Sequence, residues 1–149
     1  MKYILEKKYK WGIDTNIFVY LLNKSSKFNN KTENLFDYIQ KNKIQIYTTD
    51  LCVLEVLHIL RLKFDIPYKD CIHQFSNLAN LIGLQIVMPN FITLSNTSKT
   101  LYKLGKKRIC YDIYITNTFK TNDINHIITA NEKDFKLDEE IAIYNPFVS

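Results

Sequence analysis

The sequence lacks long apolar runs and has few residues that interrupt secondary structure. Its apolar stretches are short, as at residues 51–54, whereas a membrane-spanning helix requires roughly 20 apolar residues. A transmembrane span is therefore excluded. Only three glycines and three prolines occur, and no Gly/Ser-rich linker or repeat divides the chain. We expect residues 1–149 to form a single domain, with residues 1–10 as an N-terminal arm or an edge strand.

Cysteine is also scarce. Cys52, Cys71 and Cys110 are widely spaced, and an odd number without a CxxC pair supports neither a disulfide framework nor a zinc knuckle. We expect reduced, buried thiols. Charged residues at positions 6–8 interrupt the apolar start of the chain, so a signal peptide is not expected. These features predict a cytoplasmic protein.

Positive charge exceeds negative charge. Twenty Lys and Arg residues face 15 Asp and Glu residues, for a net charge of +5. A surplus of this size favours polyanionic partners, although many ordinary proteins carry as much. Residues 99–108 contain five basic side chains and no carboxylate. The charge is therefore unevenly distributed along the chain.

Hydrophobic periodicity predicts an alternation of strands and helices. The chain is 46% hydrophobic, which is sufficient for one full core. Strands are expected at 9–13, 44–47, 84–88, 124–129 and 140–144. Helices are expected at 17–22, 30–42, 51–64, 68–81, 111–120, from 90 or 93 to 104, and briefly near 133. This order indicates an α/β fold with a parallel sheet between helices.

Glu55 lies in an unusually apolar segment. It shares positions 51–60 with only one other polar residue, His58, so the predicted helix should be buried on most sides. A buried carboxylate costs several kcal/mol unless it is paired or bound to a metal. No Lys or Arg stands three or four positions away. Glu55 is therefore a candidate metal ligand, unless it lies on an exposed stripe or pairs with a distant base.

Asp14 and Asp112 begin predicted helices. Asp14 follows the first strand, at the carboxyl edge where open α/β sheets bind ligands, although it could equally serve as a helix cap. Asp112 opens a helix among apolar and aromatic neighbours, and an acid there also gains about 0.3–1 kcal/mol from the helix dipole. Each acid has a structural explanation, so only their combination indicates a site.

Four motifs in order resemble the PIN-domain family, and in particular VapC-like toxin ribonucleases. They are Ile13-Asp14-Thr15-Asn16, Thr48-Thr49 with Leu54-Glu55-Val56, Tyr111-Asp112-Ile113-Tyr114-Ile115, and Ile128-Thr129-Ala130-Asn131-Glu132-Lys133-Asp134-Phe135. The similarity extends from about Trp11 to Phe147. It implies a PIN-like three-layer sandwich with a central, mostly parallel sheet of about five strands.

The resemblance implies a cluster of catalytic, metal-binding acids. Asp14, Glu55 and Asp112 match the first three acids of the family. Where many relatives carry a fourth Asp, this chain has Asn131, and Asp134 follows three residues later. Asp134 is therefore the candidate fourth ligand, and Asn131 is an alternative ligand or a supporting residue. Such an oxygen-only set selects Mg²⁺ or Mn²⁺, which would activate water for attack on a phosphodiester.

Further residues are expected to support this chemistry. Thr15 and Asn16 could orient Asp14 through hydrogen bonds, or could simply start the helix. Lys106, Lys107 and Arg108 precede Asp112 and are candidates for binding RNA phosphates. A solvated surface explains these three basic side chains equally well.

The expected activity is Mg²⁺- or Mn²⁺-dependent hydrolysis of RNA phosphodiesters by an endoribonuclease. The resemblance implies that the chain is the toxin of a toxin-antitoxin pair, with a cognate antitoxin protein and a homodimer as its protein partners. Two alternatives stay open. One is a catalytically impaired PIN-like module that binds nucleic acid or protein, and the other is an RNA-processing nuclease without an antitoxin.

Overall fold

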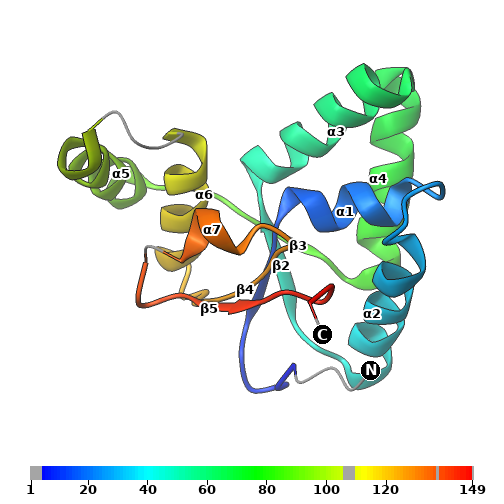
Figure 1. Ribbon diagram of the computed structural model, residues 1–149, viewed down its shortest axis with the longest axis horizontal. Helices are drawn as coiled ribbons and strands as arrows, with labels where there is room; N and C mark the ends of the chain where they lie inside the picture. Colours follow the sequence, from blue (N-terminus) through cyan, green and yellow to red (C-terminus); the bar gives the residue numbers. More distant parts are fainter. Residues whose placement is uncertain (1–4, 106–109, 137, 149) are drawn as a thin grey trace.

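A computed structural model describes residues 5–105, 110–136 and 138–148, and its strands and helices alternate along the chain (Figure 1). The strands are β1 (Trp11–Ile13), β2 (Ile46–Thr49), β3 (Gln85–Val87), β4 (His126–Ile128) and β5 (Ala142–Tyr144). The helices are α1 (Thr15–Leu22), α2 (Asn29–Asn42), α3 (Asp50–Phe64), α4 (Tyr68–Ile82), α5 (Phe91–Leu104), α6 (Cys110–Lys120) and α7 (Glu132–Phe135). The predicted order of elements is confirmed.

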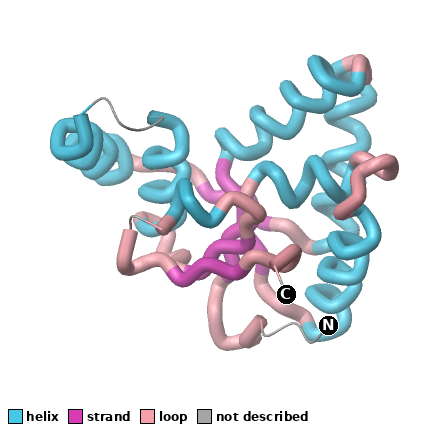
Figure 2. The backbone as a smooth tube through the Cα atoms, in the orientation of Figure 1, coloured by secondary structure: helices cyan, strands magenta, loops and turns pink. Residues whose placement is uncertain are grey.

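The five strands form one parallel sheet in the order β3-β2-β1-β4-β5. Figure 2 shows this sheet between two groups of helices, with α1 to α4 on one side and α5 to α7 on the other. Ile128 packs into the core beneath the first group and Ile127 into the core beneath the second, because successive strand residues point to opposite faces. The predicted α/β sandwich, with a central parallel sheet of five strands, is thus confirmed.

The central strand β1 lies where the strand order reverses. From β1 the chain proceeds to β2 and β3 on one side, and it later returns to β4 and β5 on the other. Ile13, the last residue of β1, pairs with Ile128, the last residue of β4. The crevice between these two strand ends is the place where open α/β sheets bind their ligands.

Two helices begin directly at this carboxyl edge of the sheet. The Asp14 side chain accepts a hydrogen bond from the Thr15 N–H at the start of α1, and the Thr49 hydroxyl accepts one from the Cys52 N–H at the start of α3. Short polar side chains stabilise helix starts in this way. The first turns of α1 and α3 are therefore held beside each other at the strand ends.

Two expectations about burial are wrong. Helix α3 is not buried on most sides, since Leu54 is 61% and Leu62 is 67% exposed. The buried residues of α3 are Cys52, Val56 and Leu60, and the helix packs against α1, α4 and β2. Cys110 is exposed, unlike the buried Cys52 and Cys71, since it begins α6 at the surface; all three are free thiols.

Of the helices described, none has the length and apolar character needed to cross a membrane.

Candidate active site

Four acidic side chains from separate parts of the chain line one cleft of about 390 Å³ at the carboxyl edge of the sheet. Asp14 follows β1, Glu55 lies on α3, Asp112 lies in the first turn of α6, and Asp134 lies on α7. Asn131 also lines this cleft. The structure therefore brings together the four candidate acids and Asn131. The sequence analysis proposed these residues from segments that lie up to more than 100 positions apart along the chain.

Asp14 is the most enclosed of these acids, with 8% of its surface exposed. Its Oδ1 accepts a hydrogen bond of 2.8 Å from the Thr15 N–H. Its Oδ2 accepts bonds from the Asn16 side-chain amide at 2.8 Å and from the Thr129 hydroxyl at 2.7 Å. Three donors thus hold the carboxylate in one orientation at the crevice between β1 and β4.

Burial and neighbouring charge oppose ionisation of Asp14. Loss of solvent raises the pKa of Asp14 from 3.8 to about 6, and the hydrogen bonds from Thr129 and Thr15 offset only part of this effect. The negative charges of Glu55 and Asp112 also raise the pKa of Asp14. The two other acids are therefore close enough to act on Asp14 electrostatically.

Glu55 is tied to the same helix start by Thr15. The Thr15 hydroxyl donates a hydrogen bond of 2.5 Å to Glu55 Oε2, while the Thr15 N–H binds Asp14. Thr15 therefore links two of the four acids. Its hydroxyl donates a hydrogen bond to Glu55, whereas the Asn16 side-chain amide donates one to Asp14. Glu55 itself is only half-buried, so solvent reaches it from the cleft.

The side chain of Asn131 is hydrogen-bonded to Asp134. Its side-chain amide donates a hydrogen bond to Asp134 Oδ2, and its backbone N–H donates one of 3.0 Å to the Thr129 hydroxyl. The Asn16 carbonyl oxygen accepts a bond of 3.1 Å from the Ala130 N–H. The segment after β4 is thus hydrogen-bonded to the residues that hold Asp14.

The donor set fits a hard divalent cation in its chemistry. The side chains in the cleft supply carboxylate and amide oxygens, which Mg²⁺ and Mn²⁺ prefer, and a cation would offset the charge that burial penalises at Asp14. Across residues 5–105, 110–136 and 138–148, no group of three His, Cys, Asp or Glu side chains stands close enough to hold one ion. The acids share the cleft without converging on a single point.

Two residues of the site were not nominated from the sequence. Thr129 is fully buried and donates to Asp14; the available signal was a polar residue directly after β4, at the same sheet edge as Asp14. Lys63 lines the acidic cleft at the end of α3, and it follows Glu55 by eight residues, two steps of the four-residue spacing that aligns side chains on a helix. Residues 106–108, the nominated phosphate-binding positions, lie outside the described residues.

The fold is that of PIN-domain toxins. The chain superposes with a TM-score of 0.70 on VapBC2 from Rickettsia felis, solved with a promoter DNA fragment, at 17% identity over 91% of this chain and 98% of that one. It matches FitAcB from Neisseria gonorrhoeae with a TM-score of 0.70, at 18% identity over 93% and 99%.

A third solved structure is Mycobacterium tuberculosis VapC20, described as a sarcin-ricin-loop-cleaving toxin. The TM-score is 0.63, at 9% identity over 78% of this chain and 86% of that one. No family model and no curated protein sequence matches the chain. At these identities the similarity establishes the shared fold, which is the fold that the four sequence motifs predicted.

Proposed function

We propose that this protein is a divalent-metal-dependent endoribonuclease. The observation that carries the proposal is the shared cleft of Asp14, Glu55, Asp112 and Asp134, located at the strand-order reversal of the sheet. Clustered carboxylates repel one another unless a cation offsets their charge. One of the solved neighbours is described as a toxin that cleaves the sarcin-ricin loop, which supports RNA as the substrate class.

The chain's own residues would prepare the site for the metal. Asp14 is oriented by Thr15, Asn16 and Thr129, so its carboxylate loses little conformational freedom on binding. Thr15 holds one oxygen of Glu55, and Glu55 lines the cleft. Asp14, Glu55 and Asp112, with Asp134 as the fourth acid, would hold the metal either directly or through its bound water, since they line one cleft without converging on a single point. When bound, Mg²⁺ or Mn²⁺ supplies the positive charge that favours phosphodiester hydrolysis.

The test is cleavage of single-stranded RNA by purified protein with Mn²⁺, with Mg²⁺, and with EDTA. Asp112→Asn should lower the cleavage rate about 100-fold or more, the scale for losing one group that stabilises charge in a transition state. Glu55→Gln should act in the same direction.

Asp70→Asn is the matched control. Asp70 lies in the first turn of α4, as Asp112 does in α6, so both changes remove an acid from a helix start, but only Asp112 lines the cleft. Asp70→Asn should leave cleavage unchanged. Full activity of a folded Asp112→Asn variant would refute the assignment.

A second candidate function is a nucleic-acid- or protein-binding module without catalysis. It is favoured by the absence, among the described residues, of three acids close enough to hold one ion, and by Asn131, which brings no charge and donates its amide to Asp134. RNA binding that persists in EDTA, without cleavage in either metal, would select this function.

We further propose an antitoxin and a second copy of the chain as partners. VapBC2, FitAcB and a Klebsiella pneumoniae protein described as a toxin-antitoxin complex are among the solved neighbours. The described chain also leaves large apolar side chains exposed on α3, α4 and α5, as protein interfaces require. They include Leu54, Leu62, Ile72, Phe91, Leu94 and Tyr102. Co-purification of a small protein encoded beside this chain would separate a toxin from a processing nuclease without an antitoxin.

A further inference from the structure

A second cavity, of about 160 Å³, opens between α5, α6 and α7 next to the acidic cleft. We call it the side pocket. Its walls include Thr100, Leu104, Ile113, Thr116, Asn117 and Phe135. Asp134 lines both the side pocket and the acidic cleft. The two cavities are therefore neighbours that share one side chain.

The size of the side pocket suits one six-membered ring. A protein cavity of about 150 Å³ accepts benzene, so about 160 Å³ accommodates a single aromatic ring and leaves little room for a fused pair. Ile113 and Phe135 are buried and, with Leu104, provide apolar walls. A flat apolar ring with polar edges matches these walls.

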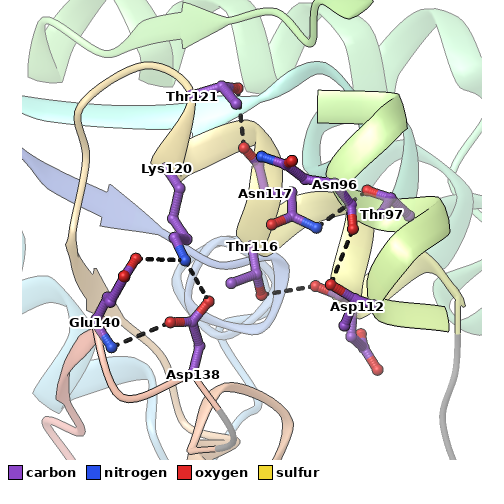
Figure 3. Close-up of polar contacts among 10 residues, drawn as sticks. Asn96, Thr97, Asp112, Thr116, Asn117, Lys120, Thr121, Asp138 and Glu140 are labelled. Carbon is purple, nitrogen blue, oxygen red and sulfur yellow. Dashed lines mark hydrogen bonds and ion pairs between the residues drawn. The ribbon is translucent and has the colours of Figure 1, made fainter. Parts of the chain in front are cut away.

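The polar groups of the side pocket offer mainly acceptors. The Thr116 hydroxyl donates to the Asp112 carbonyl at 2.8 Å, and the Thr100 hydroxyl donates to the Asn96 carbonyl at 2.9 Å. The Asn117 amide donates to Thr97 at 3.2 Å (Figure 3). The single O–H donors of Thr116 and Thr100 and one of the two amide N–H donors of Asn117 are thereby used. The hydroxyl and amide oxygens of these three side chains can accept hydrogen bonds from a ligand.

Asp138, which also lines the side pocket, forms an ion pair with Lys120. The Lys120 Nζ atom lies 2.9 Å from Asp138 Oδ2 and 2.7 Å from Glu140 Oε2. Figure 3 draws both ion pairs. Lys103 adds a cation to the pocket lining. The pocket therefore combines an apolar interior and acceptor oxygens with a lysine that can contact a phosphate.

The geometry of α6 connects the side pocket to the acids. Ile113, Thr116 and Asn117 follow Asp112 by one, four and five residues on the same helix. With a rise of about 1.5 Å per residue, Thr116 lies roughly 6 Å from Asp112 along the helix axis. A ligand held at Asp112 can therefore reach the pocket within a nucleotide or two.

We propose that the side pocket binds one unpaired pyrimidine base beside the phosphodiester that is cleaved, and that it prefers cytosine to uracil. The proposal rests on the nuclease function proposed above. Cytosine presents an amino group that donates hydrogen bonds, which the acceptor oxygens of Thr100, Thr116 and Asn117 can receive. Proteins read RNA sequence by enclosing such unstacked bases, so the side pocket would determine where the RNA is cut.

The experiment is cleavage of an RNA pool with a randomised single-stranded segment in Mn²⁺, followed by sequencing of the product ends. The unmodified protein should enrich cytosine at one position within two nucleotides of the cut. Thr100→Leu places extra carbon atoms in the pocket and should reduce this enrichment at least about fivefold. Thr116→Val removes one of the three acceptors at nearly constant volume, so it should reduce the preference for cytosine over uracil while pyrimidines stay preferred over purines.

Ser98→Leu is the matched control for Thr100→Leu, because Ser98 is exposed, lies on α5 like Thr100, and does not line the pocket. This variant should keep the cytosine enrichment of the unmodified protein. Thermal unfolding of each variant checks that the fold is retained. Cleavage without base preference, a preference for a purine or for uracil, or an enrichment that Thr100→Leu leaves intact would overturn the pocket assignment while the nuclease function stands. Absence of any cleavage in Mn²⁺ or Mg²⁺ would overturn both proposals.

Discussion

Asp14 should destabilise the metal-free fold, so replacing it with Asn should increase stability. Burial raises the pKa of Asp14 from 3.8 to about 6. Between these two values the folded state holds a proton that the unfolded state has released, so stability falls as the pH rises. At about 1.4 kcal/mol per pKa unit, the ionised carboxylate costs about 3 kcal/mol above pH 6.

Asp14→Asn removes this penalty but also disturbs the local hydrogen bonds. The new side-chain oxygen can still accept from the Thr15 N–H, and the Thr129 hydroxyl can rotate to accept from the new amide. The Asn16 amide, which donates to Asp14 Oδ2 at 2.8 Å and to the Thr129 hydroxyl oxygen at 3.3 Å, loses the first of these two acceptors, at a cost of about 1 kcal/mol. The expected net gain at pH 8 is therefore about 2 kcal/mol.

Urea unfolding in EDTA at pH 8 and pH 4 measures this gain. With an m-value of about 2 kcal/mol per M, the midpoint should rise by about 1 M at pH 8. The gain should vanish at pH 4, where Asp14 is protonated in the folded protein. Asp37→Asn, a change at an exposed acid on α2, should shift neither midpoint. A variant less stable than the unmodified protein at pH 8, or one with an equal gain at both pH values, would refute the reasoning.

Two other substitutions test the packing of the sheet. Burial lowers the pKa of His126 below 6.5, so His126 makes the folded protein less stable as the pH falls below 6.5. His126→Phe keeps a ring beside Tyr9, whose ring centroid lies 3.9 Å from that of His126. The thermal midpoint of this variant, relative to that of the unmodified protein, should therefore rise as the pH is lowered from 7.5 to 5. A Cβ at Gly12 would lie 2.8 Å from the buried Phe119 ring, so Gly12→Ala should cost about 1–3 kcal/mol in urea unfolding, and an unchanged midpoint would contradict this contact.

The candidate acids were accessible to sequence reasoning because their signals are local. Asp14 ends an apolar strand, Glu55 interrupts an apolar helix, and Asp112 opens another helix. Each signal depends on a few neighbouring residues. The alternation of strands and helices is similarly local, since it follows from hydrophobic periodicity, and this explains why the predicted fold agrees with the observed one.

Burial along α3 was not accessible in the same way. The apolar composition of 51–60 predicted a helix enclosed on most sides, yet Leu54 and Leu62 are largely exposed. Apolar composition indicates that a surface favours burial, but it does not specify which neighbour covers that surface. In this chain α3 packs against α1, α4 and β2, and these neighbours leave Leu54 and Leu62 uncovered.

The sequence by itself determined the strand and helix order, which acids are candidates for the site, and the oxygen-only chemistry expected of them. The tertiary structure decided which side chains hold those acids. Thr129 reaches Asp14 across 115 residues, and Thr15 reaches Glu55 across 40, because β4 pairs with β1 and α3 starts beside α1. Contacts of this kind depend on the order of strands in the sheet, and residue spacing along the chain carries no record of that order.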